Sequence, residues 1–210
     1  MRTVVSIGSD QEGTLMEICN VLIVGIGGQG VILASNVLGE ACIHAGIPVR
    51  SAETHGMAQR GGSVDCHVRI GSRFGPLIPK GGADILISFE LLEALRFRHF
   101  LRRDGVMILN DLMVVPTSVF VQGLEVPQRE AVISRLEGEK YMLIPASKLA
   151  EEAGSALTQN IVMIGAASPY LPIPEESLLE GVKQTVPAKT REMNTRAFHL
   201  GRTVAEEKAK

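Results

Sequence analysis

The sequence predicts an α/β protein with a doubly wound, mostly parallel sheet and a helical C-terminal segment. The first observation is the apolar run Val21–Val24, which is rich in β-branched residues and typical of a strand buried on both faces of a parallel sheet. A glycine-rich turn follows at 25–30, and from Val31 to about Ala45 the apolar residues recur at helical spacing. Further strands then alternate with helices, which is the pattern of a parallel, Rossmann-like sheet covered on both faces.

The remaining elements follow from periodicity and from turn residues. Strands are expected at Val49–Ala52, Ser63–Ile70, Asp84–Phe89, Val106–Asn110, Thr117–Val121 and Tyr141–Ile144, and helices at Glu90–Arg98, at 127–139 and from Ser147. The strand Ser63–Ile70 alternates apolar residues with Asp65, His67 and Arg69, so we expect it to be half-buried and antiparallel to the others.

The chain divides into three parts. Residues 1–19 are polar, lack periodicity and form an N-terminal extension. Residues 20–158 form the Rossmann-like core. Residues 159–210 carry helices broken by prolines, and we expect this segment to pack on the core or on a partner.

Composition excludes several classes of protein. The 210 residues are 45% hydrophobic and 21% charged with a formal net charge of −2, which argues against bulk nucleic-acid binding. No apolar run is long enough for a membrane helix, and the N-terminus lacks a signal core, so the sequence indicates a cytoplasmic protein. The three cysteines, Cys19, Cys42 and Cys66, are too dispersed for a disulfide framework, a structural zinc or an iron–sulfur cluster, so we expect no metal site on this chain.

The turn Gly25-Ile26-Gly27-Gly28-Gln29-Gly30 has the spacing of a dinucleotide-binding loop, with a strand before it and a helix after it. The unpaired N–H groups and the partial positive charge of a helix N-terminus favour an anion there. Glu53 follows the turn at the spacing in sequence where a dinucleotide-binding protein has its ribose-binding acid, but it is equally consistent with a solvated loop residue. The turn therefore binds a phosphate-bearing ligand, contacts a partner, or only packs a strand against a helix.

A second loop at the end of a strand gathers a histidine, a glutamine, an arginine and several glycines. Its candidate ligand-binding residues are His55, Gly56, Gln59, Arg60 and Gly61. Arginine binds carboxylates and phosphates with two parallel hydrogen bonds, and the carboxyl ends of parallel strands are where ligands bind in open sheets. No nucleophile with a base and an orienting group is present, so we expect no catalytic residue here. Alternatively, this loop is a hinge at a protein interface and binds no ligand.

Taken together, Gly25–Gly30 and Gly-Met-Ala-Gln-Arg-Gly-Gly-Ser-Val at 56–64 resemble the gamma domain of 2-oxoacid:ferredoxin oxidoreductases, in particular the beta subunit of the indolepyruvate enzymes. The resemblance covers about residues 20–201. It continues through Asp84-Ile85-Leu86-Ile87-Ser88-Phe89-Glu90, Asn160, Gly165 and Asn194-Thr195-Arg196-Ala197-Phe198-x-x-Gly201.

The resemblance implies a division of labour between subunits. A partner subunit would carry thiamine diphosphate and [4Fe-4S] clusters, decarboxylate the 2-oxoacid and pass electrons to ferredoxin, and coenzyme A would take the acyl group. This chain would complete a hetero-oligomeric complex, would be inactive alone, and would help to hold coenzyme A through its two loops. Asn160 is expected to cap a helix, and either touches a partner or only satisfies the backbone.

Two other functions remain open at this point. A stand-alone dinucleotide-dependent oxidoreductase would place Glu53 on a ribose. A ligand-sensing scaffold domain would have no catalytic partner. Neither the particular 2-oxoacid nor the oligomeric state follows from the residues.

Overall fold

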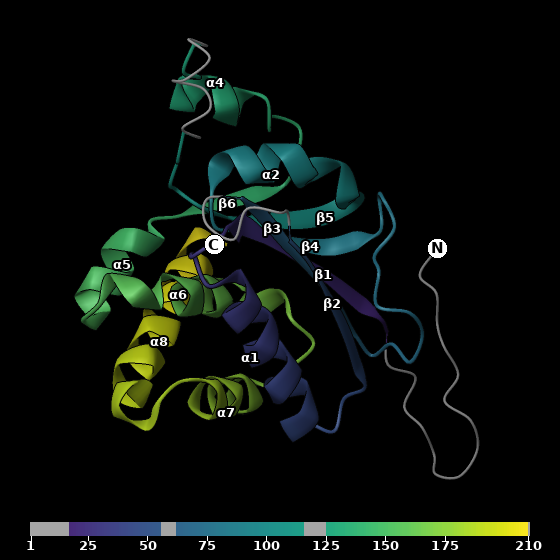
Figure 1. The fold of residues 1–210 in the computed structure, drawn as a ribbon, viewed down its shortest axis with the longest axis vertical. Helices are drawn as coiled ribbons and strands as arrows, with labels where there is room; N and C mark the ends of the chain where they lie inside the picture. The colour runs from purple at the N-terminus through teal and green to yellow at the C-terminus, as the bar shows by residue number, and fades with distance from the viewer. Residues whose placement is uncertain (1–16, 56–61, 116–124, 210) are drawn as a thin grey trace.

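The computed structural model describes residues 17–55, 62–115 and 125–209, and it contains a six-stranded sheet with helices on both faces (Figure 1). The strands are β1 (Cys19–Ile26), β2 (Val49–His55), β3 (Ser63–Ile70), β4 (Ala83–Ser88), β5 (Leu101–Asn110) and β6 (Tyr141–Ile144). Their order is β2-β3-β1-β4-β5-β6. Strands β1, β4, β5 and β6 are parallel, whereas β3 is antiparallel to both β1 and β2. The predicted α/β class and the antiparallel strand Ser63–Ile70 are confirmed.

Seven α-helices surround the sheet in the described residues. They are α1 (Val31–His44), α2 (Leu91–Phe97), α4 (Arg129–Ser134), α5 (Ala146–Ala153), α6 (Gln159–Ala167), α7 (Glu175–Thr185) and α8 (Arg191–Lys208). Helices α1, α6 and α8 pack on one face of the sheet and α2 on the other (Figure 1).

The β1 sequence explains why both faces are covered. Val21 and Ile23 belong to the apolar core shared with α1, α6 and α8, whereas Leu22 and Val24 belong to the core beneath α2. All four side chains are fully buried. A continuous apolar run is therefore required, because successive side chains of a strand point to opposite faces.

Among the predicted elements, two differ most from the structure. Strand β5 begins at Leu101 and not at Val106, because Leu101 pairs with Ala83 across a register shift, and the polar residues after Leu101 interrupt the apolar pattern. The helix predicted at 127–139 is confined to α4, which ends at Ser134 and is followed by turns. The predicted strand Thr117–Val121 lies outside the described residues.

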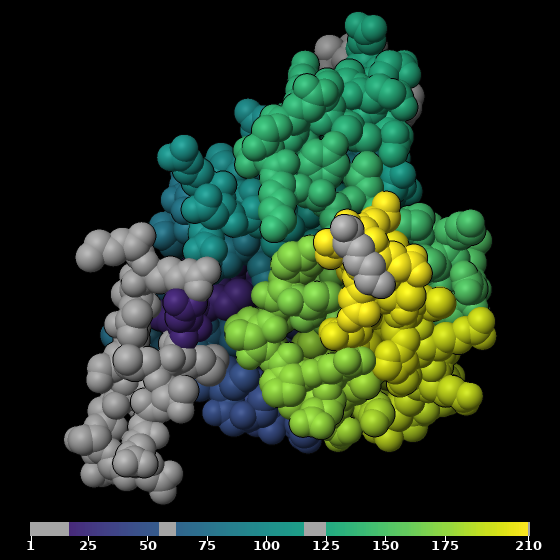
Figure 2. Space-filling view, turned by 180° about the vertical axis from the view of Figure 1, so that it is seen from behind, coloured from purple at the N-terminus to yellow at the C-terminus, as the bar shows by residue number. Residues whose placement is uncertain are grey.

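The C-terminal helices pack on the same core as the strands. Residues 159–209 form one continuous region of the surface (yellow-green to yellow in Figure 2). Helices α6 and α8 approach closely through two glycines: a Cβ at Gly165 would lie 2.8 Å from the Phe198 carbonyl carbon, and one at Gly201 would lie 2.8 Å from that of Val162. Gly165 and Gly201 are both residues that carry the family resemblance. The close contact gives a physical reason for them, because no residue other than glycine lets the two backbones touch.

Candidate functional site

The glycine turn between β1 and α1 folds back on itself. The Ile26 N–H donates to Gln29 Oε1 (2.8 Å), and the Gln29 N–H donates to the Ile26 carbonyl oxygen (3.0 Å). Gly28 and Gly30 have φ values of 102° and 82°, a backbone conformation that residues other than glycine rarely adopt. The long polar side chain of Gln29 thus closes the turn, which spacing alone does not reveal.

Two of the glycines are also required by close packing. A Cβ at Gly25 would lie 2.7 Å from Gln29 Oε1 and 3.1 Å from Phe89 Cβ. A Cβ at Gly30 would lie 2.5 Å from Asn160 Nδ2, so α6 approaches the turn directly. Helix α1 begins after Gly30, which offers no side-chain cap, and its first turn has no acidic residue. Its first N–H groups are therefore available to an anion.

The second predicted loop returns beside the glycine turn. The register of β1 and β3 pairs Ile26 with Ser63, and the Gly27 N–H donates to the Gly62 carbonyl oxygen (2.8 Å). His55 is the last residue of β2, and Gly56, Gln59, Arg60 and Gly61 lie outside the described residues. The structure therefore brings Gly25, Gly27, Gly28, Gln29 and Gly30 together at the carboxyl end of β1, and the roles of the second loop stay predictions.

Two buried carboxylates hold this end of the sheet together. The Ser63 hydroxyl donates to Glu93 Oε2 (2.5 Å), and Glu90 caps α2 by accepting the Glu93 N–H (2.8 Å). Glu90 also accepts the Val114 N–H (3.0 Å), so it joins α2 to the segment after β5. Glu90 is fully buried, and this desolvation raises the pKa of its carboxyl group. Glu90 belongs to the stretch that carries the family resemblance, but no local pattern predicts its hydrogen bonds, because Val114 and Ser63 are distant from α2 in the chain.

An open cavity of about 350 Å³ lies at the carboxyl ends of β1, β4 and β5. It is lined by Gly28, Gln29, Gly30, Leu33, Phe89, Asn110, Leu112, Ala156, Leu157, Gln159, Asn160 and Met163, none of which is charged. Asn110 braces its wall: Nδ2 donates to the Phe89 carbonyl oxygen and to Gln159 Oε1 (both 3.2 Å), and Oδ1 accepts the Ala146 N–H (3.2 Å). The wall thus consists of apolar side chains and fixed amides next to a helix N-terminus.

Asn160 is not the helix cap that the sequence predicted. Thr158 is the N-cap of α6, and Asn160 lies inside the helix, where its side chain is buried against Gly30. The resemblance pointed to this residue, but its position beside the glycine turn depends on the packing of α6 against α1.

The sheet order argues against a conventional dinucleotide site. In such a site the second strand lies next to the first, so that its terminal acid reaches the ribose. Here β3 separates β2 from β1, and Glu53 pairs with Cys66 of β3 and is exposed. Glu53 therefore lies two strands away from the glycine turn.

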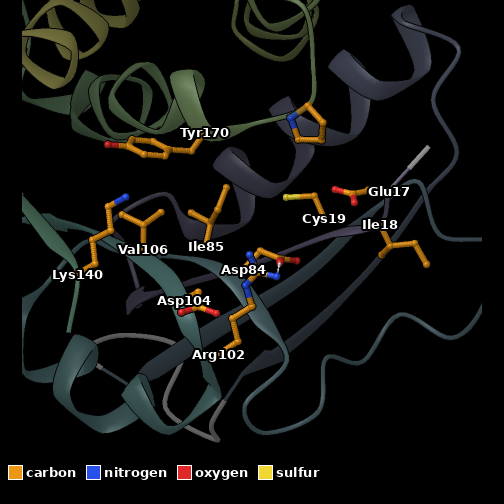
Figure 3. Close-up of a pocket in the computed structure, with 11 residues that line it drawn as sticks. Glu17, Ile18, Cys19, Asp84, Ile85, Arg102, Asp104, Val106, Lys140 and Tyr170 are labelled. Carbon is orange, nitrogen blue, oxygen red and sulfur yellow. Dashed lines mark ion pairs between the residues drawn. The ribbon is translucent and has the colours of Figure 1, made fainter. Parts of the chain in front are cut away.

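A second cleft lies at the amino ends of the parallel strands, opposite the first cavity, and the sequence did not predict it (Figure 3). Arg102 Nη1 lies 2.8 Å from Asp84 Oδ1, and Lys140 Nζ lies 6.0 Å from the centre of the Tyr170 ring. These residues come from four separate parts of the chain, so no local motif reveals the cleft. Its lining carries two cations and three carboxylates, among them Asp104, so charges of both signs are mixed and the cleft selects neither an anion nor a cation.

Within the described residues, no three or more histidine, cysteine or acidic side chains group together as a metal site. Nor do those residues contain a helix long and apolar enough to cross a membrane.

Fold and site together define a Rossmann-like α/β domain with an uncharged, glycine-lined cavity at the carboxyl edge of its sheet. Residues 20–204 match the family Pyruvate ferredoxin/flavodoxin oxidoreductase. The chain is 41% identical over 186 residues to indolepyruvate oxidoreductase subunit IorB of Archaeoglobus fulgidus, covering 87% of this chain and 92% of the relative. It is 33% identical over 190 residues to 2-oxoglutarate synthase subunit KorC of Methanothermobacter thermautotrophicus, covering 88% and 94%. The chain belongs to the pyruvate ferredoxin/flavodoxin oxidoreductase family, as the sequence motifs predicted.

Solved structures have the same fold. The gamma subunit of a keto/oxoacid ferredoxin oxidoreductase from Geobacter sulfurreducens superposes with a TM-score of 0.68 at 23% identity, over 90% of this chain and 99% of that one. The second structure is a 2-oxoglutarate:ferredoxin oxidoreductase from Magnetococcus marinus, solved with 2-oxoglutarate, coenzyme A and succinyl-CoA. It superposes with a TM-score of 0.70 at 23% identity, over 90% of this chain and 31% of that chain.

Proposed function

We propose that this chain is the small subunit, carrying neither thiamine nor clusters, of a 2-oxoacid:ferredoxin oxidoreductase that acts on indolepyruvate or related arylpyruvates. The observation that carries this proposal is the 41% identity to two indolepyruvate oxidoreductase subunits over 92% and 96% of their lengths. Identity to the 2-oxoglutarate synthase subunit is lower, at 33%. The substrate class therefore follows the more similar relatives.

The partner subunit supplies the redox chemistry in this proposal. Thiamine diphosphate bound there would decarboxylate the 2-oxoacid, and [4Fe-4S] clusters would carry the electrons to ferredoxin. Cys42 and Cys66 do not fit a cluster, because both are buried and burial raises the pKa of each thiol to about 12, whereas a ligand must be a thiolate. Hence the clusters belong on the partner, and this chain is inactive alone.

The contribution of this chain is to bind coenzyme A at the edge that it shares with the partner. Gly25, Gly27, Gly28, Gln29 and Gly30 form a turn at the N-terminus of α1, and a helix N-terminus favours a phosphate group. The second loop, with His55, Gly56, Gln59, Arg60 and Gly61, ends beside that turn at Gly62. Arg60 would add a positive charge for the phosphates. The Magnetococcus marinus relative, whose structure contains coenzyme A, is consistent with such a site.

Reconstitution tests this function. The chain is mixed with the thiamine- and cluster-containing subunit encoded in the same genome, and dye reduction is followed with indolepyruvate, phenylpyruvate, 2-oxoglutarate or pyruvate. We expect coenzyme A-dependent reduction with the two arylpyruvates and kcat/KM at least about tenfold lower with the other two, since a missing aromatic ring leaves a large apolar surface unburied. Equal kcat/KM for 2-oxoglutarate would contradict the assigned substrate class.

A further inference from the structure

The second cleft, at the amino ends of the parallel strands, places ionic groups next to an apolar wall (Figure 3). Arg102, Asp104 and Val106 alternate along β5 and all line the cleft, so their side chains project from the same face of the strand. Neighbouring side chains on one face of a strand are about 7 Å apart. A guanidinium group, a carboxylate and an apolar side chain therefore follow one another along the cleft.

The charged groups of the cleft are not all paired. Arg102 Nη1 lies 2.8 Å from Asp84 Oδ1, and Asp84 Oδ2 also accepts the Asn20 N–H (2.7 Å). Asp104 and Lys140 are both exposed, and neither side chain has a hydrogen bond or an ion pair within the described residues. An ammonium group and a carboxylate thus border the same cavity without neutralising each other.

Arg102 has an unused donor as well. Among the described residues, its Nε is the only buried side-chain nitrogen or oxygen atom without a hydrogen-bond partner. Buried donors in native proteins are nearly always satisfied, by protein, water or ligand. The Arg102 side chain is 30% exposed, so the rest of the guanidinium group borders the cavity. An unsatisfied donor at this position indicates that an acceptor binds in the cleft.

The apolar wall and the size of the cleft limit the ligand to a small molecule. The Tyr170 ring is half-buried and lies across from Ile85 and Val106, with Lys140 Nζ 6.0 Å from its centre (Figure 3). The cavity measures about 240 Å³, which is below the roughly 300–1,000 Å³ of sites for drug-sized ligands. Aromatic rings pack favourably against one another in offset or edge-to-face arrangements. The cleft therefore fits a small molecule with two opposite charges at one end and an aromatic group at the other.

We propose that the second cleft binds a free α-amino acid with an aromatic side chain. Lys140 and Arg102 would hold the α-carboxylate, and Asp104 would hold the α-ammonium group. The aromatic side chain would lie between Tyr170 and Val106. A simple anion would meet the charge of Asp104 and a simple cation that of Lys140, so the mixed charges favour a ligand that carries both signs. This site lies at the opposite end of the parallel strands from the glycine turn, and it goes beyond the proposed function.

Calorimetric titration of the full-length chain with L-phenylalanine tests the proposal. For a ligand of about twelve non-hydrogen atoms we expect a Kd of about 1 mM. Phenethylamine lacks the carboxylate and 3-phenylpropionate lacks the ammonium group. Each should bind at least about tenfold more weakly, since a hydrogen bond to a charged group is lost. The inference is wrong if L-phenylalanine does not bind at about 20 mM, or if either analogue binds as tightly.

Two substitutions test the assigned residues. Asp104→Asn and Lys140→Met each remove one charge and keep the approximate shape of the side chain. Because both residues are exposed, Tm should stay within about 2 °C of the wild-type value. Each substitution should raise the Kd for L-phenylalanine about tenfold. A wild-type Kd in either variant would overturn the assignment.

Lys148→Met is the matched control. Lys148 is also exposed, lies on α5 and does not line the cleft. This variant should keep the wild-type Kd. An equal loss of affinity in Lys148→Met would show that the net charge of the chain determines binding, and would overturn the inference. Because the titration uses this chain without a partner, its outcome is independent of the reconstitution that tests the proposed function.

Discussion

Gly201→Ala should destabilise the protein strongly, because the α6–α8 contact leaves no room for a methyl group. The added Cβ would lie 2.8 Å from the Val162 carbonyl carbon, nearer still to its oxygen, and 3.1 Å from the Ala166 nitrogen. Ordinary contacts of a Cβ begin at 3.4 Å. All of these atoms belong to helix backbone, so no side chain can rotate away and the helices must separate.

The cost of that separation can be estimated from the packing it disturbs. Phe198 is fully buried between the helices, and Val162 and Ala166 have no exposed surface. Overpacking at such a position costs about 3 kcal/mol, and for a chain of this size that lowers Tm by about 10 °C. Thermal unfolding followed by circular dichroism measures the shift.

Gly39→Ala is the control within the same chain. Gly39 lies in α1, and a Cβ there meets nothing within 4 Å. Alanine should raise the free energy of unfolding by about 1 kcal/mol, because glycine is the poorer helix former. If Gly201→Ala is as stable as the wild type, or if Gly39→Ala is equally destabilised, the argument from backbone contact is refuted.

Three further predictions concern the second loop, the buried carboxylate and the thiols. Arg60→Ala should raise the KM for coenzyme A in the reconstituted complex about tenfold or more, because a phosphate loses a charged partner, and should leave Tm unchanged. Burial raises the pKa of Glu90 in the folded protein, so the folded state holds this proton more tightly than the unfolded state, whose value is 4.5. Stability should therefore decrease as the pH rises from 4.5 through the folded pKa, and urea unfolding of Glu90→Gln should lack this part of the decrease. At a pH of about 8, iodoacetamide should label no more than one of the three cysteines in the folded protein, since burial raises the pKa of Cys42 and Cys66 to about 12.

Each of these predictions has a clear contrary result. An unchanged KM for coenzyme A in Arg60→Ala removes that residue from the site. If the free energy of unfolding has the same pH dependence in Glu90→Gln and in the wild type, Glu90 does not contribute to that dependence. Rapid labelling of two or three thiols in the folded state, as counted by mass spectrometry, contradicts the burial of Cys42 and Cys66.

The sequence predicts most of the sheet because its strands have simple patterns. The run Val21–Val24 and the alternation in Ser63–Ile70 each specify burial without knowledge of the rest of the chain. Strand β5 was predicted too short because its first residues are polar and Leu101 is held by pairing with Ala83, a contact that periodicity does not contain. His67 was assigned to the polar face, yet it is buried: Nδ1 accepts the Ile78 N–H (3.0 Å) and Nε2 lies 3.1 Å from Asp65 Oδ2.

The candidate site is only partly encoded by local motifs. Spacing identifies the glycine turn, because its conformation depends on residues that are consecutive in the chain. It cannot show that Gln29 closes the turn or that Asn160 packs on Gly30, since these contacts depend on side-chain geometry and on how α6 docks. Local sequence likewise cannot show that β3 separates Glu53 from the turn, because strand order is a property of the whole sheet.

The most direct test of the central claim is the rate of indolepyruvate-dependent dye reduction by the thiamine-containing subunit, measured as this chain is titrated in. We predict negligible activity for either chain alone and a rate that rises to saturation as the complex forms. The claim is contradicted if the thiamine-containing subunit alone works as fast as the mixture.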